Sequence, residues 1–246
     1  MDATETLRAN LDRVRQRITA AEARFGRRVG SVQLLAVSKG VAADKVRDAW
    51  AAGQCCFGEN YLQEALAKMA DPTLDGAGME WHFIGPLQAN KTKKIAAHFA
   101  WVQSVDRLVI AQRLSEQRPP HLPPLNICLQ VNISAESSKS GVGLEQLRNL
   151  AEQVAALPHL RLRGLMCIPK PATDFAQQRA PFRALREALE KLHAAGLPLD
   201  TLSMGMSDDL EAAIAEGATM VRIGRAVFGE RSSKVRSEAY GYAGEE

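Results

Sequence analysis

The sequence predicts an α/β protein that folds as a single parallel (β/α)₈ barrel of the TIM type, with an additional helix at its N-terminus. Short apolar runs rich in β-branched residues alternate with segments of helical periodicity. Eight such strand–helix units follow one another, and repeated units of this kind predict a parallel sheet. The length of 246 residues is typical of one such barrel, which takes about 250 residues. A doubly wound open sheet is the competing architecture.

The first predicted element is an amphipathic helix at residues 4–25. Strands are then predicted at residues 32–38, 54–57, 80–84, 100–103, 125–131, 160–166, 199–202 and 218–223. The intervening periodicity predicts helices at 42–52, 59–70, 107–116, 144–156 and 175–195, with shorter ones at 90–97 and 208–216. The proline-rich stretch 119–124 is predicted to be the loop before the fifth strand. Residues 1–230 are therefore assigned to the barrel with its N-terminal helix, and residues 231–246 to a polar C-terminal tail.

Composition indicates an ordinary globular protein, with 46% hydrophobic and 24% charged residues. The 31 basic and 28 acidic residues are interspersed, and no basic stripe with interleaved aromatic residues occurs, so nucleic acid is not an expected partner. The N-terminal segment is charged throughout and no run of 18 apolar residues exists, so we expect a cytoplasmic protein without a membrane span. The four cysteines form no CxxC pair and are expected to be buried free thiols.

Polar residues recur where the predicted strands end. Because the carboxyl ends of parallel barrel strands meet at one face, these side chains should collect at the mouth of the barrel. Each could be an ordinary turn residue, but their recurrence on nearly every strand favours a binding site. The residues concerned are Lys39, Asn60, His82, Gln88, Asn90, Lys91, Ser104, Asn132, Ser203, Ser207 and Arg222, with Met166 and Gly224 beside them.

Lys39 is the residue with the clearest chemical implication. It emerges from the apolar run Leu-Leu-Ala-Val, where loss of hydration disfavours an ammonium group. A neutral lysine amine is a nucleophile suited to forming an imine with an aldehyde. The alternative interpretation is a lysine whose stem is buried and whose charged end reaches water.

Two short segments after the last two strands are candidates for binding an anion. The segment Ser-Met-Gly-Met-Ser at 203–207 precedes a predicted helix start, and Arg-Ile-Gly-Arg at 222–225 follows the eighth strand. Barrels often bind phosphate at the loops after strands seven and eight. The alternative is a pair of tight turns that require glycine. Asp208 and Asp209 would cap a helix well but would repel an anion. The five histidines show no paired spacing, so no metal site is predicted.

The sequence resembles the pyridoxal phosphate homeostasis protein family, small relatives of the alanine racemase barrel domain. The matching strings are AVSKG at 36–40, FGENYLQE at 57–64, WHFIGPLQANK at 81–91, VNISAESSKSGV at 131–142, GLMCIP at 164–169, SMGMSDD at 203–209 and VRIGRAVFG at 221–229. They span residues 30 to 230 or so, and their order and spacing agree. One departure is CIPKPATD at 167–174, where relatives read closer to TIAPY, which leaves the shape of that loop open.

This resemblance implies a bound cofactor, pyridoxal 5′-phosphate (PLP), held as a Schiff base on Lys39. It further implies that Ser203, Ser207 and the amides around Gly224 hold the phosphate and that Arg222 faces the pyridine nitrogen. By the same resemblance, the cavity is lined by Asn60, His82 and Met166. Lys139, in a polar loop, could also contact an anion.

The function implied is intracellular PLP homeostasis without catalysis. A cation facing the pyridine nitrogen disfavours its protonation, and an unprotonated ring is a poorer electron sink. The racemases take a second acid–base group from a separate C-terminal domain, which this sequence is not expected to contain. We therefore expect a monomer that stores PLP and supplies it to apo-enzymes that depend on PLP. Two alternatives remain, namely a PLP-dependent amino-acid racemase of weak activity and a barrel enzyme that acts on another phosphorylated aldehyde or ketone.

Overall fold

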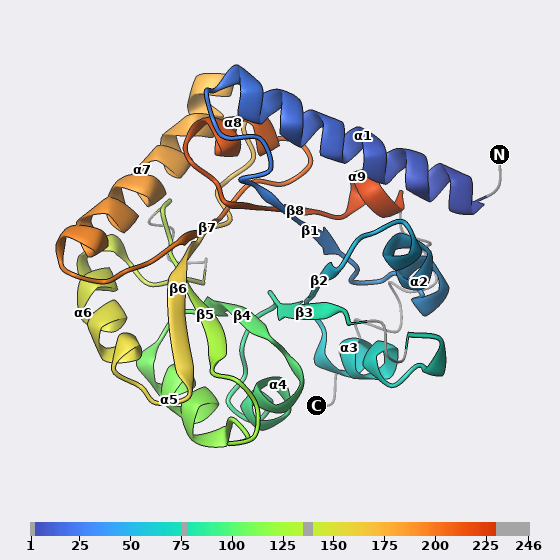
Figure 1. Cartoon of the computed structure of the whole chain (residues 1–246). Coiled ribbons are helices and arrows are strands. Elements are labelled where there is room, and N and C mark those ends of the chain that lie inside the picture. The colour runs from blue at the N-terminus through green and yellow to red at the C-terminus, as the bar shows by residue number, and fades with distance from the viewer. Residues whose placement is uncertain (1–2, 75–77, 135–139, 230–246) are drawn as a thin grey trace, which may run out of the picture.

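The computed structural model describes residues 3–74, 78–134 and 140–229, and over these residues it confirms the predicted barrel. All neighbouring strands are parallel and pair in chain order, and the ring closes between β8 and β1 (Figure 1). A doubly wound sheet is thereby ruled out, because such a sheet is open and has two unpaired edges. The predicted tail at 231–246 and Lys139 lie outside the described residues.

Each predicted strand is present, within a few residues of its expected bounds. The apolar runs form strands because both faces of a barrel strand are covered, by side chains inside the ring and by helices outside it. The strands are β1 (Gln33–Val37), β2 (Cys56–Glu59), β3 (Glu80–Phe83), β4 (Trp101–Val105), β5 (Leu125–Gln130), β6 (Leu160–Met166), β7 (Thr201–Ser203) and β8 (Met220–Ile223).

The helices lie outside the ring of strands (Figure 1). They are α1 (Ala3–Arg24), α2 (Ala43–Ala51), α3 (Leu62–Met69), α4 (Thr92–His98), α5 (Leu108–Gln117), α6 (Leu144–Ala155), α7 (Phe175–Ala194), α8 (Leu210–Ala215) and α9 (Arg225–Phe228). The sequence did not predict α9 or the 3₁₀ turn Pro72–Leu74, because a single helical turn carries too few residues to show a period. Among the described helices, none combines the length and the apolar character that a membrane crossing requires.

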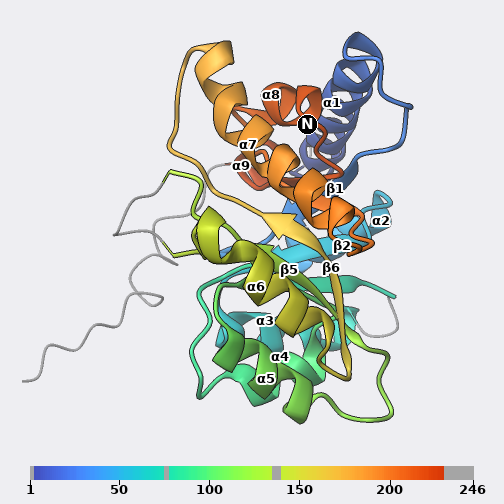
Figure 2. The same ribbon diagram turned by 90° about the vertical axis from the view of Figure 1, so that its left-hand side faces the viewer.

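The N-terminal helix α1 is packed on the barrel beside α8 and α9 (Figures 1 and 2). Its buried side chains recur every three or four residues and form one apolar stripe: Leu7, Leu11, Val14, Ile18 and Ala21. On its polar side, Arg17 pairs with Glu211 of α8 at 2.9 Å and donates to the carbonyl oxygen of Ser207 at 3.1 Å. The helix therefore supports the loop after β7, which the sequence assigned to the binding site.

A chain of polar side chains crosses the barrel interior. The side-chain nitrogen of Gln103 on β4 lies 2.8 Å from Nδ1 of His82 on β3 and 3.0 Å from the sulfur of Met220 on β8. Its oxygen accepts a hydrogen bond of 2.6 Å from Ser203 on β7. Side chains from both sides of the ring thus meet at its centre, so the barrel is a packed core and not a pore. Ligand chemistry is consequently confined to the ends of the barrel.

The cysteines only partly match the prediction. None of the four forms a disulfide, and Cys128 and Cys167 are buried as expected. Cys56 is half-buried and Cys55 is exposed, so the prediction of burial is wrong for Cys55. The reason is that β2 begins at Cys56, which leaves Cys55 ahead of the strand at the outer edge of the barrel.

Candidate functional site

Lys39 lies just beyond the carboxyl end of β1, where the sequence placed it. The strand ends at Val37, and the amide of Ser38 still donates to the carbonyl of Gly58 on β2 at 3.0 Å. The chain then turns at Gly40, whose φ of +69° lies in the left-handed region that favours glycine. The Lys39 side chain is half-buried. It therefore leaves the barrel at the mouth, from a turn and not from within the regular strand.

A buried ionic network lies directly behind this turn. The ammonium group of Lys68 on α3 is hydrogen-bonded to Glu59 at 2.7 Å, to Glu64 at 2.6 Å and to the carbonyl oxygen of Ser38 at 2.6 Å. Burial raises the pKa of Glu59 above its ordinary value, although the neighbouring Lys68 opposes this shift. Sequence reasoning missed the network because a helical lysine is normally exposed. The available signal was the spacing, because Lys68 continues the buried stripe of Leu62 and Ala65.

Arg222 on β8 lies in the barrel wall close to the mouth and is almost completely buried. Its guanidinium donates to Ser203 Oγ at 2.9 Å and to the carbonyl oxygen of Cys167 at 2.8 Å. Burial lowers the pKa of Arg222. The hydroxyl of Ser203 in turn donates to Gln103 at 2.6 Å. The structure therefore brings two predicted site residues, Arg222 and Ser203, into direct contact.

The loop that follows β7 is attached to strand β8. The carbonyl oxygen of Gly205 accepts a hydrogen bond of 2.9 Å from the amide of Arg222, a residue of β8. Gly205 has a φ of +94°, and a Cβ atom there would lie 2.6 Å from the Cβ of Ala213, so only glycine fits. Ser207 is half-buried on this loop, and Gly224 follows β8 as the N-cap residue of α9. That Ser207 and the amides around Gly224 hold a phosphate stays a prediction.

The loop after β7 also carries an acidic side chain, that of Asp209. The carboxylate of Asp209 accepts a hydrogen bond of 2.6 Å from the amide of Met206. Burial raises the pKa of Asp209 above its ordinary value, and the hydrogen bond from Met206 and the charge of Arg222 oppose this shift. The repulsion of an anion that the sequence suggested for Asp209 stays a prediction.

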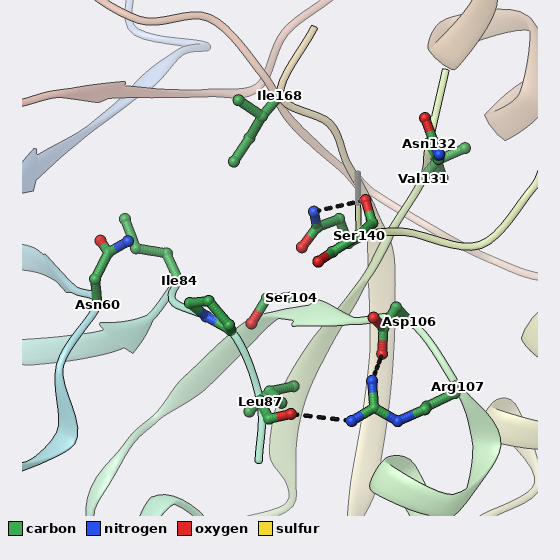
Figure 3. Close-up of a pocket in the computed structure, with 12 residues that line it drawn as sticks. Asn60, Ile84, Leu87, Ser104, Asp106, Arg107, Val131, Asn132, Ser140 and Ile168 are labelled. Atoms are coloured by element: carbon green, nitrogen blue, oxygen red, sulfur yellow. Dashed lines mark hydrogen bonds and ion pairs between the residues drawn. The ribbon is translucent and has the colours of Figure 1, made fainter. Parts of the chain in front are cut away.

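A cavity of about 390 Å³ opens on the side of the mouth formed by β2 to β6 (Figure 3). The polar groups around it include Asn60, Ser104 and Asn132, all singled out from their positions at strand ends. The Oδ1 atom of Asn60 is buried and has no hydrogen-bond partner among the described residues. A buried acceptor without a donor is rare in proteins, and it indicates a place for a ligand donor or water. On the far side, Arg107 is held by Asp106 at 2.7 Å and by the carbonyl oxygen of Leu87 at 3.0 Å (Figure 3).

The remaining two predicted cavity residues lie deeper in the barrel. His82 is fully buried and its ring stacks on Trp101, with 5.2 Å between ring centroids. Met166 is fully buried against Trp101 and Cys128. Neither side chain is among those that line the cavity, and of the eight predicted residues only Asn60 is, within the part of the chain that the structure describes. The contact of His82 and Met166 with a ligand stays a prediction.

A second group of polar side chains lies toward the opposite end of the barrel. Glu80 Oε1 is 2.9 Å from His82 Nε2 and 3.7 Å from the sulfur of Cys56, a combination of atoms that can hold a metal ion. The amide of Gln103 donates to His82 Nδ1, so the ring hydrogen is on Nε2 and points to Glu80. Burial lowers the pKa of His82, and the bond to Glu80 opposes this. The group is thus satisfied as a neutral histidine that donates to a carboxylate.

Comparisons with known proteins bear on the family and the fold of this chain. Residues 5–232 match the family described as alanine racemase, N-terminal domain. A pyridoxal phosphate homeostasis protein of Pseudomonas aeruginosa is 61% identical over 226 residues, which are 92% of this chain and 96% of that protein. The structure of PipY of Synechococcus elongatus with PLP bound superposes with a TM-score of 0.75 at 40% identity, covering 86% of this chain and 100% of PipY.

A more distant structure supports the fold alone. Alanine racemase of Corynebacterium glutamicum superposes with a TM-score of 0.69 at 18% identity. The match covers 93% of this chain and 61% of the racemase. The predicted likeness to the barrel domain of alanine racemase is confirmed.

Proposed function

The chain belongs to the pyridoxal phosphate homeostasis protein family, and from this we propose that it holds PLP as a Schiff base on Lys39 and supplies it to apo-enzymes that depend on PLP. The observation that carries the proposal is the position of Lys39, half-buried at the barrel mouth between β2 and the β8 strand that bears Arg222. The proposed cofactor-binding unit is residues 1–230. One chain contributes every residue of the site, so a monomer is sufficient.

The residues present fit the proposed group. PLP carries a phosphate, a phenolic hydroxyl, a pyridine nitrogen and an aldehyde. The buried Oδ1 of Asn60 needs a hydrogen-bond donor, which a hydroxyl group supplies. Ser207, on the loop after β7, and Gly224, directly after β8, lie at the strand ends where barrels commonly bind phosphate. Asn60 also lines the cavity of about 390 Å³, whose size suits a small-molecule ligand, although none of the other seven proposed residues lines it in the described part of the chain.

Each of this chain's residues then has a defined task. When bound, PLP supplies an aldehyde carbon that reacts with a primary amine. Lys39 Nζ adds to that carbon, and loss of one water leaves a C=N bond that masks the aldehyde. Addition of water to this bond reverses the step and returns the amine and the free cofactor. Storage and release therefore require no other reactant.

Arg222 favours a carrier over an enzyme. Its guanidinium is fixed by Ser203 and by the carbonyl oxygen of Cys167, so it cannot turn away from its position in the barrel wall. A fixed cation against the pyridine nitrogen disfavours protonation of that nitrogen. The bound ring is then a weak electron sink, which disfavours the removal of protons from amino acids. The second candidate, a weak amino-acid racemase, predicts exchange of the α-hydrogen of alanine in deuterated water above the rate given by free PLP.

Covalent binding is tested by trapping. Purified protein loaded with PLP should show a visible absorbance band, and borohydride should fix the cofactor on the peptide that contains Lys39, as identified by mass spectrometry. Lys39→Ala should lose the band and retain the native circular dichroism spectrum. Lys45→Ala, which removes an exposed lysine from α2, is the matched control and should bind as the wild type does. Recovery of the trapped cofactor on a different lysine would refute the assignment.

Delivery needs a separate experiment. The loaded protein is mixed with an apo-enzyme that requires PLP, in the presence of a phosphatase that destroys free cofactor. Direct supply predicts reactivation despite the phosphatase, whereas equimolar free PLP should reactivate little. Equal loss of reactivation from both sources would show that the cofactor is released into solution first and would reject direct supply.

A further inference from the structure

We propose that Glu59, Glu64 and Lys68 form a clamp that positions Lys39 for its reaction with an aldehyde. This inference rests on the proposed function of Lys39 and extends it to residues that do not reach the cofactor. Glu59 is the last residue of β2, and Glu64 and Lys68 are one turn apart on α3. None of the three lines the cavity, and neither does Lys39, so what connects them to Lys39 is the turn at residues 38–40.

The clamp holds the backbone on both sides of Lys39. On the preceding side, the carbonyl oxygen of Ser38 accepts a hydrogen bond of 2.6 Å from Lys68 Nζ. On the following side, the amide of Gly40 donates to Glu64 Oε1, also at 2.6 Å. The same Glu64 oxygen also accepts a hydrogen bond from Lys68 Nζ. The ion pair between Glu64 and Lys68 therefore connects the hydrogen bond at Ser38 to the hydrogen bond at Gly40.

Glu59, the third residue of the clamp, connects Lys68 to Ser38 inside the protein. Glu59 is fully buried, and its Oε1 accepts from Lys68 at 2.7 Å and from the hydroxyl of Ser38 at 2.6 Å. Each hydrogen bond involves at least one charged group, and bonds of that kind are the shorter and stronger ones. Since β1 ends at Val37, the residues around Lys39 lie beyond the last pairing with β8. The turn is closed by a hydrogen bond of 3.0 Å from the Val41 amide to the Ser38 carbonyl oxygen, and the clamp attaches this turn to α3.

The burial of Glu59 and Lys68 indicates that the network serves to position residues 38–40 more than to stabilise the fold. Lys68 is 5% exposed and Glu59 is 0% exposed, so two charges are withdrawn from water. A buried ion pair often gives no more stability than apolar residues of the same size, because desolvation opposes the attraction. A single geometry, however, is strongly specified by such a network, and reactions between groups depend steeply on their alignment. Fixing residues 38–40 sets where the Lys39 amine emerges.

Two substitutions break the clamp at different points. Lys68→Met removes the central cation while keeping the length of the side chain, and Glu64→Ala removes the acceptor of the Gly40 amide. Glu64 is 24% exposed, so water can reach the groups that this second change leaves behind. The matched controls are Lys94→Met on α4, where the lysine is exposed, and Glu152→Ala, which breaks an exposed ion pair with Arg148. If Lys68→Met does not fold, Glu64→Ala decides the question alone.

The first readout needs no cofactor. Hydrogen exchange of the Gly40 amide in the cofactor-free protein should accelerate about tenfold in Glu64→Ala and remain unchanged in Glu152→Ala. The second readout separates reaction from binding. Capture of PLP by Lys39, followed by stopped-flow absorbance, should slow by about tenfold or more in both clamp variants. Affinity for 4-deoxypyridoxine 5′-phosphate, which has no aldehyde, should stay close to the wild-type value.

The outcomes separate this inference from the proposed function. Unchanged exchange at Gly40, an unchanged capture rate in a folded variant, or a parallel loss of capture and analogue affinity would each overturn the clamp. A wild-type chain that forms no reducible adduct would instead overturn the function proposed for Lys39. Slower capture with faster Gly40 exchange and retained analogue affinity is the result expected.

Discussion

Arg222 and Ser203 are joined by a hydrogen bond of 2.9 Å between neighbouring strands, in which the guanidinium donates to the serine hydroxyl. The serine hydroxyl itself donates a hydrogen bond of 2.6 Å to the side-chain oxygen of Gln103. In this arrangement Ser203 orients Arg222 and has no hydrogen left for a phosphate. A phosphate contact by this side chain would require the hydroxyl to turn away from Gln103, so the half-buried Ser207 is the better-placed hydroxyl donor.

Removal of the Arg222 side chain should lower the free energy of unfolding. Arg222→Met leaves the buried carbonyl oxygen of Cys167 and the hydroxyl of Ser203 without their donor, and hydrogen bonds to charged groups contribute about 1.5–3 kcal/mol each. We expect the free energy of unfolding in urea to fall by about 3 kcal/mol. Arg148→Met removes an exposed arginine of α6 and should change it by less than about 0.5 kcal/mol. Equal effects of the two substitutions would show that Arg222 is not held as described.

Gly85 should tolerate no side chain. A Cβ atom there would lie 2.1 Å from the carbonyl oxygen of Asn60, so Gly85→Ala must displace the backbone of a residue that lines the cavity. We expect weaker binding of PLP, by about tenfold or more, as measured by absorbance titration. Gly143→Ala is the control, because no atom lies within 4 Å of the added Cβ and its φ of −68° suits alanine. A Gly85→Ala protein with wild-type affinity would contradict the close approach.

Stability should decrease as the pH falls below the ordinary pKa of histidine. Burial lowers the pKa of His82 in the folded protein below 6.5, and Glu80 opposes the shift without cancelling it. Below pH 6.5 the unfolded chain therefore binds a proton that the folded chain does not. The free energy of unfolding then falls by up to about 1.4 kcal/mol per pH unit until the folded pKa is reached.

The measurement is urea unfolding at several values between pH 7 and pH 5. His82→Gln should reduce the slope against pH, and His98→Gln, which removes an exposed histidine, should keep it. A slope that survives in His82→Gln would assign the acid sensitivity to other groups.

Thiol reactivity should follow the order of exposure. Cys55 is exposed, whereas burial raises the pKa of Cys56, Cys128 and Cys167 to about 12 each. The thiolate is the reactive form, so a thiol reagent such as Ellman's should modify Cys55 rapidly and the other three slowly in the folded protein. Cys55→Ser should abolish the rapid phase, while Cys56→Ser should leave it intact. A rapid phase that persists in Cys55→Ser would contradict the burial of the others.

The fold was predictable because its signals are local. Each strand is an apolar run and each long helix has a periodic face, so their alternation could be counted directly from the residues. The position of Lys39 followed from the same pattern, since a residue that ends a barrel strand must lie at the mouth. The depth of His82 was not predictable, because both faces of a barrel strand are buried and alternation does not separate them.

The partners of polar side chains could not be predicted in the same way. Glu59, Glu64 and Lys68 are ordinary residues for a strand end and a helix, and only the fold brings them behind residues 38–40. The same holds for Gln103, which reaches three other strands across the barrel. The exposure of Cys55 depended on where β2 begins, and the ends of elements are the least certain part of a sequence-based prediction.

The pairing of β1 with β8 also determines when the barrel closes during synthesis. Leu35 is aligned with Arg222, so the strand that leads to Lys39 gains its second neighbour only from the far end of the chain. A nascent chain whose Met220–Ile223 segment is still inside the ribosome has an open ring and lacks the guanidinium. The ring around the β1 strand that leads to Lys39, and with it the proposed PLP site, therefore closes only after this last strand has left the ribosome.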